Sequence, residues 1–372
     1  MSVSRMFGLF MVLPVLALWA GKLEGATPLL VGIAVGGYGV TQALLQIPYG
    51  SLSDRIGRGP VIVFGLSIFL IGSAIAASSE SIGGLIAGRL LQGAGAVSAT
   101  LSAWLADHTR ESVRTPAMAI FGAAIGGSFL LALVLGPLLS AVFGVRGLFW
   151  ASVGFAAFGI TLTLLAMRKP GRNVVPTQKE RWRWDALLRA DLMALNLAVL
   201  LLHALLTAFF VVVPIVLLEQ VGIASAAQWK VYVVTLALSL PIAIPLIMRD
   251  GRSGSGRFQN FSLVLATVGL AGIALFPGEL LALGAGCVLF FAGFNYLEAS
   301  LPAMVSLRAD IDQRGASLGV FSSSQFFGAF VGSTAAGWLM GYSGPVTALW
   351  GLTFIAAAWL IANVALSVVN RR

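Results

Sequence analysis

Asn295 and Glu298 lie within an apolar run near the C-terminal end of the sequence, and Glu298 could carry a proton. They are three positions apart and so share one face of a helix. By the span boundaries given below, Glu298 is the one carboxylate well inside an apolar run. Apolar surroundings disfavour a charged carboxyl group, which lets it load and release protons near neutral pH. We predict that Glu298 carries the coupling proton; alternatively it pairs with Arg308 or Arg314.

An arginine and a histidine also fall inside apolar runs. Arg89 is followed by Gln92 and Gly93, and a cation in the membrane is costly unless it faces a cavity or a partner. We predict a functional role for Arg89; alternatively it extends to the outer surface. His203 could titrate, or it is a hydrogen-bonded helix contact.

Amide and phenol side chains repeat every four residues at Tyr38, Gln42 and Gln46. Polar groups facing lipid are unfavourable, so this stripe is predicted to face a central cavity. Gln325 is predicted on the opposite wall. Together with Asn295, these residues form the expected substrate cavity.

The sequence from Gly50 to Pro60 is the dense cluster of charge and turn residues in the first hundred positions. Gly57 permits a sharp turn, and Asp54 can pair with Arg58 or lie against the positive end of a neighbouring helix. Arg55 adds positive charge. The stretch is predicted to connect two membrane helices at the water boundary; the alternative is a basic loop that only sets topology.

A further acidic residue, Asp107, ends another apolar run. This end of the run can lie near the 50–60 connection, so Asp107 is predicted to join a charge network with Asp54 and Arg58. The alternative is a solvated helix end.

Glycine pairs spaced by four residues indicate close helix packing. Gly122 and Gly126 form one such pair, and Gly328 and Gly332 form another, which we expect to pack against the span at 29–49. Gly136 precedes Pro137, which removes a backbone donor and is expected to kink its helix.

The composition indicates a polytopic membrane protein. The 372 residues are 58% hydrophobic and 10% charged, with a mean hydropathy of +0.95, whereas soluble domains are about 25% charged. The single cysteine, Cys287, excludes an internal disulfide, and no Cys/His spacing indicates a metal site. The basic residues lie in alternate loops and form no nucleic-acid patch. No nucleotide-binding or hydrolase motif is present, so we predict neither enzyme activity nor a cofactor other than the proton.

Twelve spans account for the apolar runs and polar breaks. They are 6–21, 29–49, 60–78, 83–106, 115–143, 147–167, 190–217, 230–248, 258–277, 280–305, 316–340 and 346–369. With both termini in the cytoplasm, cytoplasmic segments hold 19 of the 23 Lys and Arg residues, including Arg5, and outer loops hold three. This bias predicts cytoplasmic termini.

A basic linker at 168–189 divides the spans into bundles at 1–167 and 190–372. Charged stretches recur in both parts, near 54–58 and 249–252. The fold prediction is therefore an all-α membrane protein of twelve helices in two pseudo-symmetric six-helix bundles, a known transporter architecture.

The stretch from Gly50 to Arg58 resembles motif A of the major facilitator superfamily, G-x-L-x-D-R-x-G-R-[KR], with Gly59 in place of the last basic residue. The resemblance implies that Gly50 permits close helix approach and that Asp54 with Arg58 latches one conformation. The Arg89 region resembles motif B, which implies a role in proton coupling. Gly136 and Pro137 resemble motif C of the drug/proton antiporter branch, but Ser140 and Ala141 replace its trailing glycines.

Runs at 10–16, 46–58, 229–232 and 294–302 are similar to a bacterial inner-membrane exporter of that branch, which carries a further soluble domain that we do not expect here. We therefore predict a monomeric inner-membrane exporter that exchanges protons for small amphiphilic or lipophilic substrates. The alternatives are a proton-coupled importer or facilitator of a small metabolite, a non-transporting membrane sensor and, last, an intramembrane enzyme.

Overall fold

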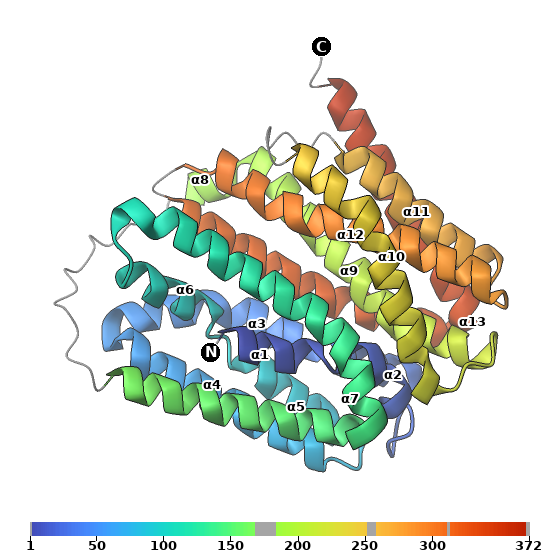
Figure 1. Cartoon of the computed structure of the whole chain (residues 1–372), viewed down its shortest axis with the longest axis horizontal. Coiled ribbons are helices and arrows are strands. Elements are labelled where there is room, and N and C mark those ends of the chain that lie inside the picture. Colours follow the sequence, from blue (N-terminus) through green and yellow to red (C-terminus); the bar gives the residue numbers. More distant parts are fainter. Residues whose placement is uncertain (1, 168–183, 251–257, 311–312, 370–372) are drawn as a thin grey trace. The chain divides into compact units, whose positions relative to one another are not determined.

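The computed structural model describes residues 2–167, 184–250, 258–310 and 313–369. These residues form helices joined by short connections, with one isolated bridge pairing Glu24 and Ser81 (Figure 1). The chain divides into two compact units: Met1–Ala26 with Ala34–Arg181, and Thr27–Ile33 with Trp182–Arg372. The division between 181 and 182 falls in the predicted linker, of which 168–183 lies outside the described residues.

Unit 1 is built from helices that approach closely at glycines. Its elements are α1 (Ser2–Phe10), α2 (Leu13–Ala20), most of α3 (Pro28–Ile56), α4 (Arg58–Ser78), α5 (Ile82–Ala94), α6 (Ser98–Asp107) and α7 (Glu111–Met167). A Cβ at Gly93 would lie 1.9 Å from the Tyr38 carbonyl oxygen, and one at Gly136 would lie 2.0 Å from that of Met11. Glycine thus lets α5 reach α3, and α7 reach the junction of α1 and α2.

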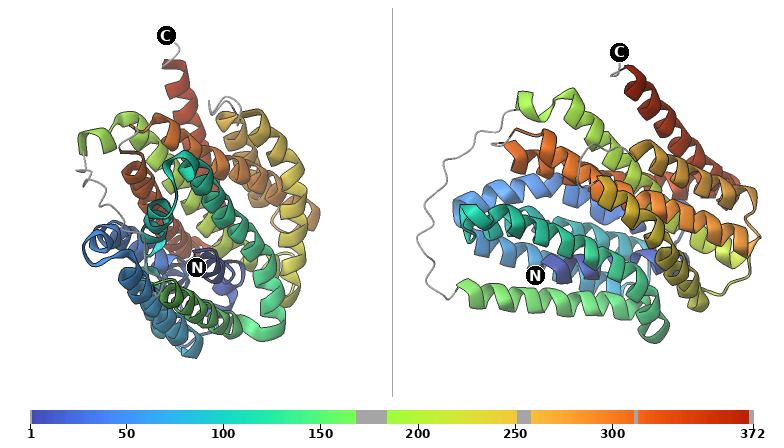
Figure 2. Two further views of the ribbon diagram at one scale, coloured as in Figure 1. Left: turned by 60° about the vertical axis from the view of Figure 1, so that its left-hand side comes forward. Right: turned by 45° about the horizontal axis from the view of Figure 1, so that its top comes forward.

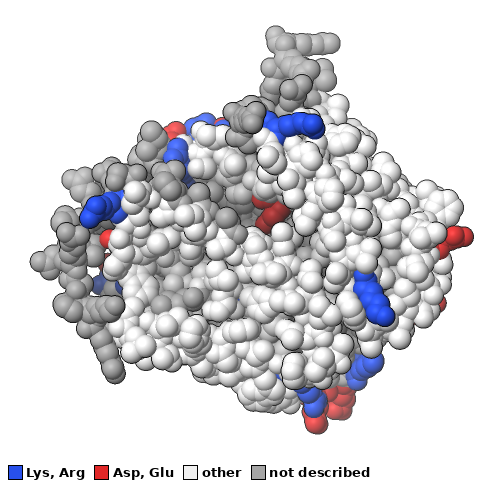
Figure 3. Space-filling view, viewed as in Figure 1, with Lys and Arg blue, Asp and Glu red and all other residues white. Residues whose placement is uncertain are grey.

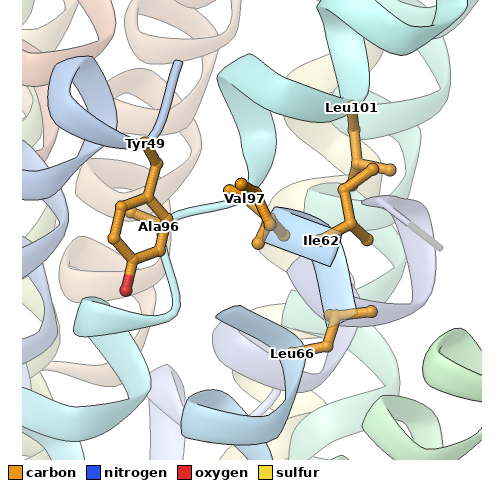
Figure 4. Packing of buried hydrophobic residues seen from close by; sticks show 7 residues of the cluster. Tyr49, Ile62, Leu66, Ala96, Val97 and Leu101 are labelled. Atoms are coloured by element: carbon orange, nitrogen blue, oxygen red, sulfur yellow. The ribbon is translucent and has the colours of Figure 1, made fainter. Parts of the chain in front are cut away.

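A buried apolar cluster lies where α3, α4 and the connection between α5 and α6 meet (Figure 4). Its labelled members are Tyr49, Ile62, Leu66, Ala96, Val97 and Leu101. The helical backbone is interrupted at 95–97, so the predicted span 83–106 is two helices, α5 and α6. The apolar cluster holds this interruption in place.

Unit 2 contains α8 (Trp184–Leu187), α9 (Ala190–Glu219), the 3-10 helix η1 (Ser225–Ala227), α10 (Gln228–Asp250), α11 (Gln259–Leu275), α12 (Leu280–Arg308) and α13 (Arg314–Val369). Helix α13 runs along α9 (Figure 2), and glycine permits the close approach, because a Cβ at Gly332 would lie 2.0 Å from the Ala204 carbonyl oxygen. Phe209 of α9 stacks on Phe290 of α12 at 4.7 Å. Cys287 is fully buried on α12.

Among the described residues, eight helices are long and apolar enough to cross a membrane. The two longest, α7 and α13, leave helical geometry at Gly144 and Gly344, which have positive φ angles of 66° and 82° and separate predicted spans 5 from 6 and 11 from 12. The count of twelve and the cytoplasmic termini stay predictions. On the face seen in Figure 3, most surface is uncharged and charged side chains gather mainly near the edges.

Both predicted glycine pairs differ in their contacts from the expectation. Gly328 and Gly332 pack against Leu200 and Ala204 of α9; helix α13 does approach α3, but one turn later, where a Cβ at Gly32 would lie 2.2 Å from the Ser333 carbonyl oxygen. A Cβ at Gly122 or Gly126 would have no described atom within 4 Å, so the close approach of α7 is at Gly136 instead.

Candidate functional site

Three polar side chains converge inside unit 2 from α9, α12 and α13. His203 Nε2 lies 2.7 Å from Gln325 Nε2 and 3.5 Å from Glu298 Oε2, and Gln325 Nε2 donates to Glu298 Oε1 at 3.4 Å. The ring nitrogen Nδ1 lies 3.2 Å from the Val199 carbonyl oxygen. We call His203, Glu298 and Gln325 the carboxylate cluster.

The hydrogen bonds of the carboxylate cluster define where a proton can lie. A carbonyl accepts only, so Nδ1 of His203 donates to Val199, and in the neutral ring Nε2 is then the acceptor that Gln325 meets. A proton added between Nε2 and the Glu298 carboxylate can bond to either atom. The Glu298 side chain is 33% exposed and that of His203 is 8% exposed, so Glu298 is the more accessible of the two.

The sequence raised Arg308 or Arg314 as partners of Glu298. Within the described residues, Glu298 Oε2 lies 3.5 Å from His203 Nε2, and no ion pair joins Glu298 to either arginine. Asn295, on the same helix, points elsewhere and donates to Ser239 Oγ of α10 at 3.1 Å. The structure therefore unites Glu298, His203 and Gln325, which sequence reasoning had assigned to two separate groups, and leaves Asn295 outside.

In unit 1, Arg89 is fully buried and bonded to neutral groups. Its guanidinium donates to the Ala34 and Val35 carbonyl oxygens of α3 at 3.2 and 3.0 Å and to Gln92 Oε1 at 2.8 Å. It also lies 4.5 Å from the Tyr38 ring centre. These contacts exclude an Arg89 that extends to the outer surface. They tie α5 to α3; the proton-coupling role stays a prediction.

The polar stripe of α3 is buried in this structure. Tyr38, Gln42 and Gln46 are at most 4% exposed, and Gln42 accepts from Arg5 at 2.9 Å. This differs from the expected exposure to a cavity, because the arginines of α1 and α5 need acceptors and aromatic partners and find them on α3. Arg5 itself, expected in a cytoplasmic segment, is buried on α1. The excess of basic residues in the predicted cytoplasmic segments does not depend on Arg5.

The predicted latch residues meet at the end of unit 1 where α3, α4 and α6 converge. Arg58 forms an ion pair with Asp54, and its Nε lies 3.0 Å from Asp107 Oδ2. Its Nη1 donates to Ser53 Oγ at 2.6 Å, a partner that the sequence did not single out. Asp107 is therefore a paired residue and not a solvated helix end.

Two glycines shape this region. Gly57 has a φ of 95°, which confirms the sharp turn before α4. Gly50 faces Ala99 of α6: a Cβ atom added to Gly50 would lie 4.0 Å from the Cβ atom of Ala99. Arg55 is exposed next to the latch residues.

Pro137 does not interrupt helix α7. Gly136 provides close packing, while the backbone stays helical through Pro137 and breaks only at Gly144. Gly144, where glycine permits a positive φ, is the connection between predicted spans 5 and 6, and the kink at Pro137 stays a prediction.

Replacing Arg58 by Gln should lower transport per folded protein about tenfold, which corresponds to about 1.4 kcal/mol, because it releases Asp54 and Asp107 together. The ion pairs are partly exposed, so the effect on stability should be smaller, about 1 kcal/mol. Initial transport rates and thermal unfolding midpoints test this. Arg55→Gln removes the same charge from an exposed neighbour and is the control; equal losses in both variants would show that charge alone matters.

Comparison with known proteins identifies the family. The sequence profile of the Major Facilitator Superfamily matches residues 1–310. The inner membrane transport protein YajR of Escherichia coli is 40% identical over 362 residues, covering 96% of this chain and 79% of that protein. The multidrug resistance protein MdtL of Escherichia fergusonii is 26% identical, covering 71% of this chain and 68% of that protein.

The solved structure of a D-xylose-proton symporter has a TM-score of 0.75 at 13% identity, covering 97% of this chain and 94% of that one, a likeness of fold. The profile match and the YajR relative extend over most of the chain, and the helices have the length and apolarity of membrane spans. This multi-pass membrane protein belongs to the Major Facilitator Superfamily of transporters.

Proposed function

We propose that this chain is a proton-coupled secondary transporter of the bacterial inner membrane that exports small amphiphilic or lipophilic compounds by alternating access. The observation that carries the proposal is the carboxylate cluster, a carboxylate and an imidazole 3.5 Å apart on membrane helices. Ionisable groups within membrane helices are costly and rare, and they commonly mark proton or substrate pathways. The name of the MdtL relative, a multidrug resistance protein, supports the substrate class.

The carboxylate cluster could couple proton uptake to a change of state. With Glu298 ionised, its Oε1 accepts from Gln325, which also meets His203. Before protonation, His203 Nε2 and Glu298 Oε2 are both acceptors, and a proton on either atom turns that atom into a donor. If the proton lies on His203, the Gln325 amide must present its oxygen to the imidazolium or turn away. Protonation would therefore change how α9, α12 and α13 are held together, and a transporter needs such a difference between states.

The test uses purified protein in liposomes with an imposed pH gradient and a trapped pH-sensitive dye. Lipophilic cations and neutral amphiphiles are added in turn. Proton efflux that depends on both protein and compound is expected for an antiporter. Compound movement without proton flux would contradict coupling and leave a facilitator, and proton flux in the same direction as the compound would indicate an importer. Protein-free liposomes are the control.

A further inference from the structure

Ser53 of α3 lies among the latch residues, at a position where the motif A pattern allows any residue. It is 2% exposed, whereas the side chain of the next residue, Asp54, is 54% exposed. One turn away on the same face of α3 is Tyr49, a member of the buried apolar cluster. Ser53 therefore places a hydroxyl group on the buried side of the latch, and Asp54 lies on its exposed side.

The chemistry of its partners fixes the direction of both Ser53 hydrogen bonds. The Gly50 carbonyl oxygen can only accept, so the Ser53 hydroxyl donates its proton there, at 2.7 Å. The Arg58 guanidinium can only donate, so its Nη1 donates to Ser53 Oγ, at 2.6 Å. Hydrogen bonds in such a chain polarise one another, and a buried setting strengthens them, so Ser53 is a good acceptor for Arg58.

Two nitrogens of the Arg58 guanidinium connect three helices. Nη1 carries two hydrogens and has two acceptors on α3, the Asp54 carboxylate and the Ser53 hydroxyl. Nε carries one hydrogen and donates it to Asp107 Oδ2 of α6 at 3.0 Å. The guanidinium is planar and rigid, so a partner that fixes its Nη1 edge also aims its Nε edge.

Asp54 alone is a weak anchor for the Nη1 edge. Ion pairs with exposed partners contribute little and are screened by salt, whereas the Ser53 hydroxyl is neutral and buried. Without that hydroxyl, one Nη1 hydrogen of Arg58 would face the buried side of the latch with no acceptor. The guanidinium would then turn toward water, and its Nε would leave Asp107.

We propose that Ser53 is a positioning residue of the transport cycle: it holds the Nη1 edge of Arg58 against α3 and so aims Nε at Asp107 of α6. This inference rests on the proposed transport function, in which the latch stabilises one of the alternating states. Ser53 acts through Arg58 and contacts no substrate.

Ser53→Ala should lower the initial transport rate per folded protein about threefold, the scale of one net hydrogen bond. Ser53→Thr keeps the hydroxyl and should transport at close to the wild-type rate. Ser102→Ala is the matched control, because Ser102 of α6 also donates to a carbonyl of its own helix, that of Ser98 at 3.0 Å, and no arginine among the described residues bonds to it. A wild-type rate in Ser53→Ala, or an equal loss in Ser53→Thr, would overturn the proposal.

A double-mutant cycle with Arg58→Gln separates positioning from a general effect on packing. If Ser53 acts through Arg58, adding Ser53→Ala to Arg58→Gln should not lower the rate further. An additional threefold loss in the double variant would show that Ser53 acts by another route. Raising the ionic strength should slow Ser53→Ala more than the wild type, because only screened ion pairs then hold Arg58; equal salt dependence would contradict the proposal.

Thermal unfolding of the purified full-length chain in detergent tests the same coupling without transport. Ser53→Ala should lower the unfolding midpoint of the wild type and leave that of Arg58→Gln unchanged. Equal shifts in both backgrounds would overturn the positioning of Arg58 by Ser53, whatever the transport assays give. If no compound moves in the wild type, the proposed function fails, and the unfolding cycle still decides whether Ser53 holds Arg58.

Discussion

Glu298→Gln should abolish substrate accumulation driven by a pH gradient while the protein still folds and binds substrate. An exchange of one proton per substrate stores about 1.4 kcal/mol per pH unit and so supports about tenfold accumulation. The variant keeps the size of the side chain and an acceptor for Gln325 but cannot take up a proton. The accumulation ratio should fall to about one, because nothing links the gradient to the substrate.

Glu279→Gln is the matched control, since Glu279 is an exposed acid at the start of the same helix, α12. It should accumulate substrate as the wild type does. Counterflow of labelled against unlabelled substrate needs no net proton movement and should persist in Glu298→Gln. Full pH-driven accumulation by Glu298→Gln would place the coupling proton elsewhere.

Gly93→Val should strongly destabilise unit 1. Its Cβ would lie 1.9 Å from the Tyr38 carbonyl oxygen and 2.2 Å from Thr41 Oγ1. Backbone cannot be moved aside as a flexible side chain can, so α5 must withdraw from α3. Arg89 would then lose its bonds to the Ala34 and Val35 carbonyls and be left buried without acceptors. We expect a loss of several kcal/mol, as for other buried charges deprived of a partner.

Gly154→Val is the control for this stability measurement. Gly154 is also in a helix of unit 1, but a Cβ there would have nothing within 4 Å. Monodisperse protein recovered after detergent extraction, and its unfolding midpoint, should be close to the wild type for Gly154→Val and strongly reduced for Gly93→Val. Equal behaviour of the two would show that α5 and α3 tolerate separation.

The sequence predicted local geometry better than partners in space. Gly57 and the charges around it had a pattern that predicts a turn, because the conformation of a short connection depends on neighbouring residues. Glu298 and His203 could each be singled out, since ionisable groups in apolar runs are rare. Their contact through Gln325 could not, because it depends on how α9, α12 and α13 pack.

Arg5 shows why the rest was missed. A basic residue just before an apolar run has the pattern of a cytoplasmic flank, and hydropathy gives no depth for it. Its place next to Gln42 follows from the packing of α1 against α3 and α6. The interruption at 95–97 was equally hidden, because its residues are as apolar as the helices on both sides.

The burial of Cys287 makes the wild-type chain a convenient background for spectroscopy. The chain's single thiol is enclosed by α12 and its neighbours with no accessible surface, so a maleimide or methanethiosulfonate reagent should not reach it in the folded protein. Cysteines introduced at exposed sites would then be the only labelled positions. Pairs with one spin label in each unit would give inter-unit distances by electron paramagnetic resonance, with and without a proton gradient.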